Sequence, residues 1–404
     1  MLNPDKSEQR FGVASLAAGQ TIVWACLFYV FPALLLRWES DFEWTKVQLT
    51  GAITLALFVS AVFSPLVGRQ IDRGHGPQIM AVGAMLGGVC VFLVSFVISL
   101  WQMYFLWGVI GLSFAACLYE PCFIMLTRGF GARAKSKIIL VTLVAGFAST
   151  ISFPLAHHIS ELWGWRAVTQ IFGAAALFVG VPLMYFGAVS VERNGLGEVT
   201  LQQHSPDKIS YLRNPVFLNI AVAFALLALV HGITLHHLLH ILTDRGLALG
   251  SAVFIASLIG PMQVVGRLFL TALRSSVSHR KIAYSCFVCM AMSMGLLYLM
   301  GWLAAWGFGV AILFVMVFGG GYGLVSIIRP VIARDLLGDE HFGTKSGLLA
   351  CFYLIGASVA PYAGSWIWSV GGYDLVLLLL LCLAIVGLGL MYLASNGARN
   401  ATAA

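Results

Sequence analysis

Twelve long apolar runs alternate with short polar segments along the chain. Each run has about 20 residues or more, which is the length a helix needs to cross a bilayer. The runs cover residues 12–36, 47–67, 78–99, 101–127, 138–159, 166–189, 215–241, 250–273, 281–303, 305–331, 346–369 and 374–395. The pattern predicts an all-α membrane protein with twelve transmembrane helices. The first run is not followed by a small-residue cleavage site, so we expect a retained helix rather than a signal peptide.

One long polar stretch divides the runs into two groups of six. Residues 191–213 contain Gly, Pro, Gln and charges of both signs, which is typical of a linker. Short motifs recur at matching places in the two groups: Gly68-Arg69 and Gly266-Arg267, Glu120-Pro121 and Arg329-Pro330, and Gly164-Trp165-Arg166 and Gly372-Tyr373-Asp374. We predict two pseudo-symmetric six-helix bundles over 1–190 and 214–404, joined by a cytoplasmic linker over 191–213.

Composition and charge restrict the class of protein and its orientation. Of 404 residues, 60% are hydrophobic and 10% charged, and the mean hydropathy of +0.93 excludes a soluble domain of this size. With the N-terminus inside, the outer segments hold only Arg37, Lys46, Arg166 and Arg245 of the 23 Lys and Arg residues. Cytoplasmic loops concentrate Lys and Arg, so we expect both termini in the cytoplasm of a bacterium and the helices in its inner membrane. The net charge of +7 follows from this bias and indicates no nucleic-acid partner.

The eight cysteines all fall inside apolar runs, which predicts no disulfide framework. Cys286 and Cys289 have a C-x-x-C spacing, but one such pair inside a helix indicates packing rather than redox chemistry or zinc binding. The sequence contains no phosphate-binding loop, catalytic triad or metal cage. We therefore expect a monomer without cofactor, metal or enzymatic activity.

A short basic segment between the second and third runs carries the most specific motif. Gly68, Asp72 and Arg73 match the pattern G-x-x-x-D-R, and Asp72 lies between two arginines in a chain with few charges. The segment resembles the loop between helices 2 and 3 of the major facilitator superfamily. It departs from that pattern at Gly76, where the expected glycine is displaced. The alternative interpretation is an ordinary cytoplasmic loop rich in positive charge.

The resemblance extends over essentially the whole chain and implies a fold and a mechanism. Three features look like those of the monocarboxylate and oxalate–formate porters. They are Trp44, the segment Pro65-x-x-Gly68 that leads into the loop, and Gly164-Trp165-Arg166. The family fold implies two six-helix halves that alternate access to a central path. In the family, the loop Asp and Arg stabilise one conformation by pairing across the halves. Monocarboxylate porters also pair an Asp with an Arg four residues later in span 8, where this chain has Gln263 and Arg267.

Three charged residues lie inside predicted spans: Glu120, Arg267 and Arg329. A charge in the bilayer interior costs at least about 2.5–3.5 kcal/mol, so it usually faces a cavity and has a partner. Each belongs to a polar stripe at helical spacing. The stripes are Ser113, Glu120 and Thr127; Gly260, Gln263 and Arg267; and Tyr322, Ser326 and Arg329.

Each of the three charges has a functional and a structural interpretation. Arg329 is an anion ligand, or else a gate or a salt-bridge partner of Glu120 or Asp335. Arg267 is a substrate ligand, or else it lies at the cytoplasmic mouth near Arg274 and snorkels. Glu120 carries a coupled proton, or else forms a permanent ion pair with an arginine of the other half. The two-fold relation of Glu120-Pro121 and Arg329-Pro330 favours a meeting of Glu120 and Arg329 across the path.

Further polar and aromatic positions are candidates for the pathway. Gln20 and Trp24 are four residues apart in the first run, and Tyr353 lies seven after Ser346. Each of these three either lines the path and contacts a flat substrate or packs in the core. His231, His236, His237 and His240 cluster in the seventh run, where we expect an outer-mouth or interfacial position rather than a metal site.

The function that these observations favour is secondary transport of a small organic anion, with or without a coupled proton. The partners are then the solute, the lipid bilayer and, in a symporter, protons. The 12% aromatic content and the incomplete carboxylate pair leave open a neutral or aromatic nutrient such as a vitamin, for example riboflavin. Alternatives of another class are a transporter-like sensor and an integral-membrane enzyme. No cluster of catalytic residues supports the enzyme.

Overall fold

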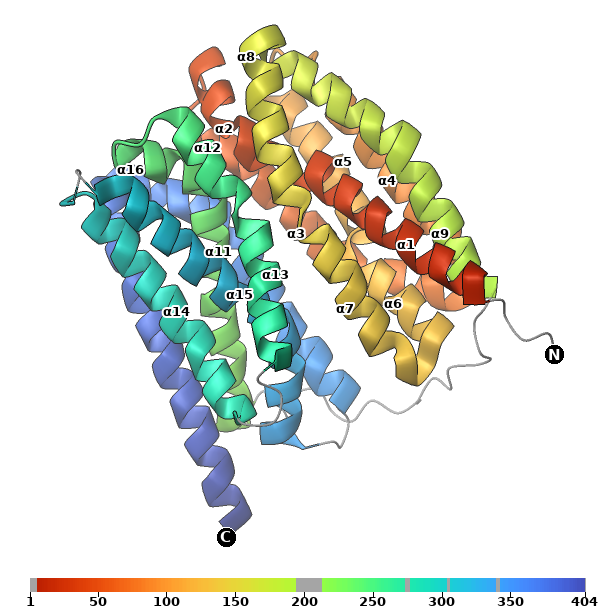
Figure 1. Cartoon of the computed structure of the whole chain (residues 1–404), viewed down its shortest axis with the longest axis vertical. Coiled ribbons are helices and arrows are strands. Elements are labelled where there is room, and N and C mark those ends of the chain that lie inside the picture. Colours follow the sequence, from red (N-terminus) through yellow and green to blue (C-terminus); the bar gives the residue numbers. More distant parts are fainter. Residues whose placement is uncertain (1–5, 194–212, 273–276, 304–305, 339–341, 404) are drawn as a thin grey trace. The chain divides into compact units, whose positions relative to one another are not determined.

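The computed structural model describes residues 6–193, 213–272, 277–303, 306–338 and 342–403. Every regular element in these ranges is a helix (Figure 1), which confirms the predicted all-α class. The chain forms two compact units, Met1–Leu201 and Gln202–Ala404. Of the predicted linker 191–213, only residues 191–193 and Arg213 lie within the described residues.

The first unit contains the helices up to Arg193. They are α1 (Lys6–Val23), the π-helix η1 (Trp24–Phe28), α2 (Val30–Asp41), α3 (Lys46–Gln70), the π-helix η2 (Ile71–His75), α4 (Gly76–Val94), α5 (Leu100–Cys117), α6 (Tyr119–Phe130), the 3-10 turn η3 (Gly131–Arg133), α7 (Ala134–Ala145), α8 (Ala148–Ala175), the π-helix η4 (Ala176–Gly180) and α9 (Val181–Arg193). The second unit contains α11 (Pro215–Asp244), α12 (Leu249–Ser257), α13 (Ile259–Ala272), α14 (His279–Met300), α15 (Gly307–Leu337) and α16 (Phe342–Ala403).

Nine helices among the described residues are long and apolar enough to cross a membrane. Three of them each extend over two predicted runs: Lys46–Val94, Ala134–Arg193 and Lys345–Gly397. Each contains a glycine with a left-handed backbone: Gly74 (φ 89°), Gly164 (φ 80°) and Gly372 (φ 67°). All three glycines lie where the sequence predicts loops. A positive φ is open to glycine and costly for other residues, so the chain can turn at these positions. The count of twelve crossings stays a prediction.

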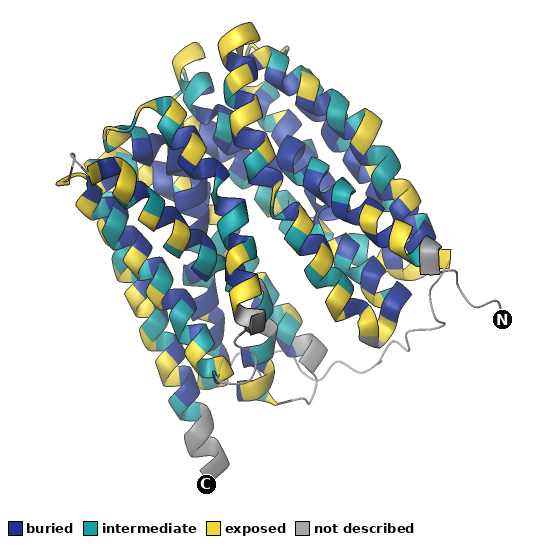
Figure 2. Ribbon diagram, in the orientation of Figure 1, coloured by how far each residue is buried: buried dark blue, intermediate teal, exposed yellow. Residues whose placement is uncertain are grey.

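Burial within each unit follows the requirements of a membrane protein. Figure 2 shows buried residues along one side of most helices and exposed ones along the other. Many exposed side chains are large and apolar, such as Phe58, Trp101, Phe178 and Trp366. In water such a surface would be a docking or aggregation site, whereas in a bilayer it contacts lipid.

Several predicted runs are broken rather than straight. The run 101–127 divides at Leu118, which has extended backbone angles (φ −79°, ψ −152°) between α5 and α6. The run 250–273 divides at Leu258 into α12 and α13, and the run 138–159 divides after Ala145 into α7 and α8. The predicted loop 68–77 is helical except at Gly74, because α3 continues to Gln70 and a π-helix follows.

The repeated glycine–aromatic–charge motif makes the corresponding contact in each unit, with opposite charges. After Gly164, the Trp165 indole donates to Asp41 (2.6 Å) at the end of α2, and Arg166 donates to the same carboxylate (3.2 Å). After Gly372, Asp374 accepts from Arg245 (2.6 Å) at the end of α11. In both units the charged residue two positions after the glycine thus forms an ion pair with a residue at the end of an earlier helix, α2 in the first unit and α11 in the second.

We expect Asp374→Ala to lower the free energy of unfolding by about 1–3 kcal/mol. The Arg245 side chain is only 8% exposed, and its pair with Asp374 supplies its negative partner. Thermal unfolding of detergent-purified protein, followed by tryptophan fluorescence, measures the change. Asp244→Ala is the matched control, because this exposed aspartate of the same helix end has no described ion pair. An equal loss in both variants would contradict a specific role for Asp374.

Candidate functional site

Three of the predicted site residues, Arg329, Tyr322 and Tyr353, lie together in the second unit. The Arg329 guanidinium carbon is 4.3 Å from the centre of the Tyr353 ring, a cation–π geometry. The Tyr353 and Tyr322 hydroxyls are hydrogen-bonded to each other. Arg329 is half-buried, and Asp335, its alternative partner, instead contacts His279 at 2.7 Å. Helices α15 and α16 thereby combine a cation with two aromatic rings.

A fourth member of this cluster is His231 of α11, which the sequence grouped with three other histidines and not with Tyr322 or Arg329. Its ring stacks on Tyr322 at 3.3 Å between centroids and 6° between planes, and on Phe318 at 5.2 Å. Its Nδ1 atom is buried without a hydrogen-bond partner among the described residues. The cluster Arg329–Tyr353–Tyr322–His231 therefore offers a guanidinium, two hydroxyls and a stacked aromatic surface, groups that suit a flat organic anion.

Arg267 and Gln263 lie together on α13, where the Arg267 side chain is buried against α15. Only 6% of Arg267 is exposed, and its Nε donates to the carbonyl of Gly323 on α15 (3.1 Å). Its Nη2 atom is 3.5 Å from Gln263 Oε1. An added Cβ on Gly323 would lie 2.3 Å from the Gln263 carbonyl oxygen, so only glycine allows the two helices to approach this closely. The choice between a substrate ligand and a residue at the cytoplasmic mouth stays a prediction.

Gln20, Trp24 and Glu120 lie together in the first unit, around the break at Leu118. Gln20 is fully buried and donates to the carbonyls of Cys117 (2.8 Å) and Leu118 (3.1 Å). Glu120 is in the first turn of α6, and its side chain is exposed rather than buried. No described residue of its own unit forms an ion pair with it. The extended backbone at Leu118 turns this carboxylate away from the core.

The loop motif forms contacts within the first unit. Asp72 lies 3.6 Å from Arg128 at the end of α6, and Arg128 also donates to the Ile71 carbonyl (2.5 Å). Arg73 is exposed. An added Cβ would meet only an ordinary contact at Gly68 (3.6 Å), whereas at Gly76 it would lie 2.1 Å from Met125 Sδ. The displaced glycine is thus the one that close packing requires.

We expect Asp72→Asn to lower the transport rate roughly tenfold while changing substrate affinity little. A tenfold change corresponds to about 1.4 kcal/mol in a conformational equilibrium. The pair with Arg128 links η2 to α6 within the first unit and includes no residue of the aromatic cluster, so we expect its loss to change populations rather than the site. Initial uptake rates and equilibrium binding separate the two effects. Arg128→Gln should reproduce the loss, and Arg133→Gln, on an exposed neighbour, should not. An unchanged rate at normal expression would remove this role.

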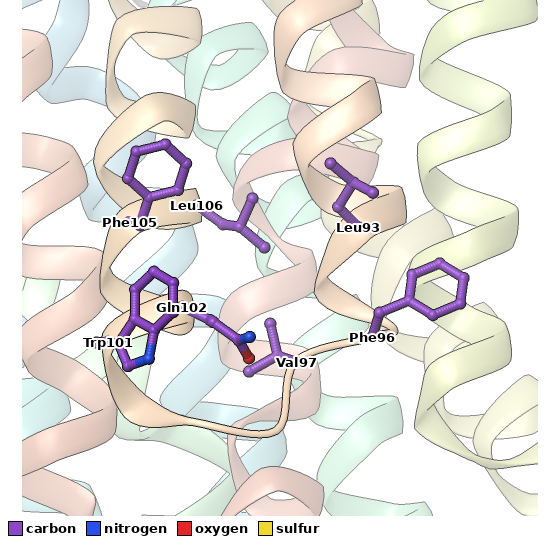
Figure 3. Close-up of a pocket in the computed structure, with 7 residues that line it drawn as sticks. All are labelled: Leu93, Phe96, Val97, Trp101, Gln102, Phe105 and Leu106. Atoms are coloured by element: carbon purple, nitrogen blue, oxygen red, sulfur yellow. The ribbon is translucent and has the colours of Figure 1, made fainter.

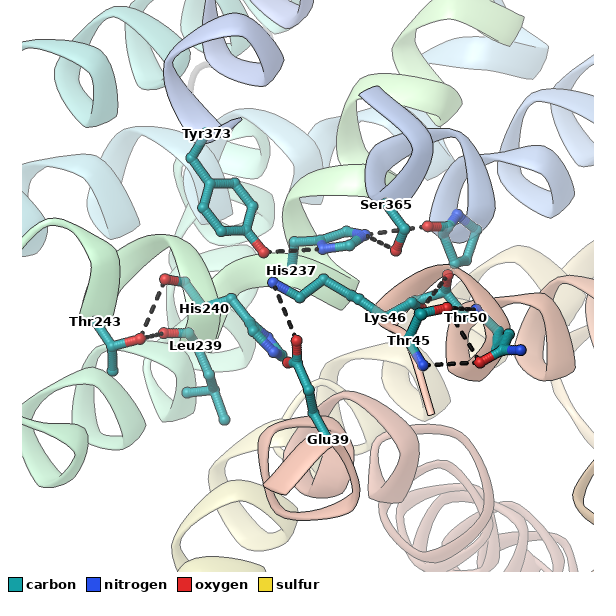
Figure 4. A network of polar contacts seen from close by, with 12 residues as sticks. Glu39, Thr45, Lys46, Thr50, His237, Leu239, His240, Thr243, Ser365 and Tyr373 are labelled. Carbon is teal, nitrogen blue, oxygen red and sulfur yellow. Dashed lines mark hydrogen bonds and ion pairs between the residues drawn. The ribbon is translucent and has the colours of Figure 1, made fainter. Parts of the chain in front are cut away.

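The four histidines of α11 are buried, and their expected outer-mouth or interfacial position stays a prediction. His231, His236, His237 and His240 are all at most 8% exposed. His237 lies 3.2 Å from the Tyr373 hydroxyl, 3.0 Å from the Pro361 carbonyl and 3.4 Å from Ser365 (Figure 4). It thereby connects α11 to both sides of the Gly372 break. No group of three His, Cys, Asp or Glu residues in the described ranges could hold a metal ion.

One cavity outside these clusters lies where α4 ends and α5 begins, and the sequence did not indicate it. Its volume is about 420 Å³. Its lining contains one amide and otherwise apolar side chains (Figure 3): Leu93, Phe96, Val97, Trp101, Gln102, Phe105 and Leu106. The Gln102 amide oxygen already accepts from the backbone of Ile98 (2.9 Å) and Ser99 (3.2 Å). A lining without charge does not suit an anion.

Comparisons with known proteins agree with these features. The sequence model of the Major Facilitator Superfamily matches residues 16–344. Monocarboxylate transporter 12-B of Danio rerio is 22% identical over 383 residues, covering 86% of this chain and 78% of that protein. Monocarboxylate transporter 4 of Rattus norvegicus is 23% identical, covering 84% and 76%. A mutant of the nucleoside transporter NupG has a similar structure, with a TM-score of 0.72, 14% identity, and coverage of 96% and 99%.

Proposed function

Because this chain belongs to the Major Facilitator Superfamily, we propose that it is a secondary transporter that carries a small organic anion by alternating access. Relatives named monocarboxylate transporters support the substrate class. The structural likeness to the nucleoside transporter supports the fold alone. We further propose that Glu120 carries a proton with the anion, and that the protein lies in a bacterial inner membrane with both termini cytoplasmic, as the charge bias favours.

The observation that carries the proposal is the position of Arg329 over the Tyr353 ring. A guanidinium inside an apolar bundle is costly unless it has a partner, and no carboxylate among the described residues pairs with it. Stacking on a ring occupies a face of the guanidinium and leaves N–H groups at its edge, which can donate to both oxygens of a carboxylate. The Tyr322 and Tyr353 hydroxyls, which are hydrogen-bonded to each other, lie at the same place and add polar groups beside the guanidinium.

A neutral or aromatic nutrient, such as a vitamin of the riboflavin kind, is the second candidate. The face-to-face stack of His231 and Tyr322 favours it, because such a surface accepts a flat ring system. A transporter-like sensor would bind the same ligands and differ only in moving none of them across the membrane.

Ligand-induced thermal stabilisation of purified protein tests the proposal. A ligand at 100 times its dissociation constant stabilises the folded state by about 2.7 kcal/mol. A panel should contain short monocarboxylates, aromatic carboxylates, their amides, and vitamins including riboflavin. We expect carboxylates to stabilise the protein and their amides not to. Stabilisation by a vitamin and by no carboxylate would replace the anion with the neutral nutrient, and binding without uptake in proteoliposomes would indicate the sensor.

A further inference from the structure

The break between α5 and α6 leaves backbone groups that the helix itself cannot satisfy. Pro121 has no N–H, so the carbonyl of Cys117, four residues before it, lacks its helical donor. Leu118 is extended, which separates the two helices. In a bilayer such a break is tolerated only where the freed groups find partners inside the protein.

A side chain from the first predicted span supplies the missing donors. Gln20 Nε2 donates to Cys117 O at 2.8 Å and to Leu118 O at 3.1 Å. One turn later on the same helix, the Trp24 ring packs on Tyr119, with 4.6 Å between centroids. Tyr119 is the residue directly before Glu120. Helix α1 and the π-helix that follows it therefore contact the break on both sides.

The same break gives Glu120 its position. The carboxylate belongs to the second residue of α6, and the N-terminus of a helix favours negative charge. A continuous helix through 118–121 would leave this side chain without that environment. Gln20 is completely buried, whereas the Glu120 side chain is exposed.

We infer that Gln20 is a positioning residue for Glu120, because its amide holds the helix break that places the carboxylate at the start of α6. The functional meaning of this inference rests on the proposed role of Glu120 as proton carrier. Gln20 Oε1 and Trp24 Nε1 are buried without hydrogen-bond partners among the described residues.

A cysteine in place of Glu120 reports its position without requiring transport. The background carries Cys351→Ser and Cys382→Ser, since these native cysteines are exposed, and labelling of that background alone is subtracted. A thiol at a helix N-terminus is more often a thiolate and reacts faster with a membrane-permeant maleimide. Adding Gln20→Leu to Glu120→Cys should slow this reaction about two- to fivefold, the range that a helix-terminus effect covers.

Two further variants keep the experiment decisive. Gln170→Leu is the control, because it removes a hydrogen-bonded amide elsewhere in the same unit, which is half-buried and donates to Ser95 at 3.3 Å, and it should leave the rate unchanged. Pro121→Ala restores the N–H that can donate to Cys117 O. We expect it to compete with the Gln20 amide and to let α5 continue into α6, while the Gln20 side chain itself is unchanged. It should slow labelling at position 120 as Gln20→Leu does, and it serves in its place if the Gln20→Leu protein does not fold.

The outcomes separate this inference from the proposed function. An unchanged labelling rate at position 120 in the Gln20→Leu protein would overturn the positioning role. If only the Pro121→Ala protein folds, an unchanged rate there would do the same. Equal slowing by Gln170→Leu would also overturn it. If labelling slows while uptake by the unmodified protein does not depend on pH, the positioning role stands and proton coupling fails. If uptake depends on pH, Gln20→Leu should shift the pH dependence of uptake as well as slow labelling. A merely structural loss would lower uptake by the same factor at every pH.

Discussion

Replacing Arg329 with glutamine is expected to remove anion binding almost completely. Arg329 is itself half-buried, and a bound anion would bury the charge pair that it forms with the guanidinium. Losing one partner of such a pair costs roughly 2–5 kcal/mol, which is about a 30-fold to several-thousand-fold rise in the dissociation constant. Glutamine keeps a polar group but loses the charge and the fork that binds both carboxylate oxygens. It also loses the cation that lies 4.3 Å from the Tyr353 ring. Titration of purified protein with the stabilising carboxylate measures the change.

Two variants show whether the effect belongs to the site. Arg334→Gln makes the same change on the same helix at an exposed position, and binding should persist. Arg329→Lys keeps the charge without the planar fork, and it should bind with intermediate affinity. If Arg329→Gln binds the anion normally and only transports it slowly, Arg329 acts as a gate. The neutral nutrient then becomes the better candidate.

Helical periodicity predicted part of the Arg329 cluster. Tyr322 and Arg329 share a face of α15, so their common location follows from spacing alone. The stack of His231 on Tyr322 depends instead on the register between α11 and α15. No local property of either sequence determines that register, and His231 therefore looked like one of four histidines with a common position.

The position of Arg267 shows a second limit of local reasoning. Its distance in sequence from Arg274 suggested the end of a span. The contact between α13 and α15 at Gly323 buries the side chain and provides a carbonyl acceptor, which the spacing did not predict. The glycine was visible in the sequence, but the partner helix to which it allows approach was not.

The break at Leu118 is an intermediate case. Pro121 stands inside an apolar run and signals a kink, because proline removes a helical hydrogen bond. We interpreted the motif Glu120-Pro121 only as half of an internal repeat, however, and expected one helix over 101–127. The motif gave no indication that the freed carbonyls would bond to Gln20 of a distant helix, or that the break would expose Glu120 instead of burying it.

Glu120→Gln is expected to flatten the pH dependence of uptake while leaving exchange of anion across the membrane intact. If Glu120 carries the coupled proton, uptake by the unmodified protein rises as the outside pH falls, because the proton gradient then drives the anion inwards. Glutamine resembles the protonated carboxyl in shape and charge but cannot release a proton. The variant should therefore equilibrate labelled anion for unlabelled anion but no longer concentrate it in response to a pH gradient.

A control variant at another exposed glutamate decides whether this effect is specific to Glu120. Glu43→Gln removes a carboxylate from the segment between α2 and α3, where the side chain is exposed, and it should keep the full pH response. Both proteins are measured in proteoliposomes with an imposed pH gradient and with equal pH on both sides. A Glu120→Gln protein that still concentrates anion with the gradient would exclude Glu120 as the proton carrier. Because exchange needs binding and alternation but no net proton movement, its loss together with the pH response would instead place Glu120 in the substrate site itself.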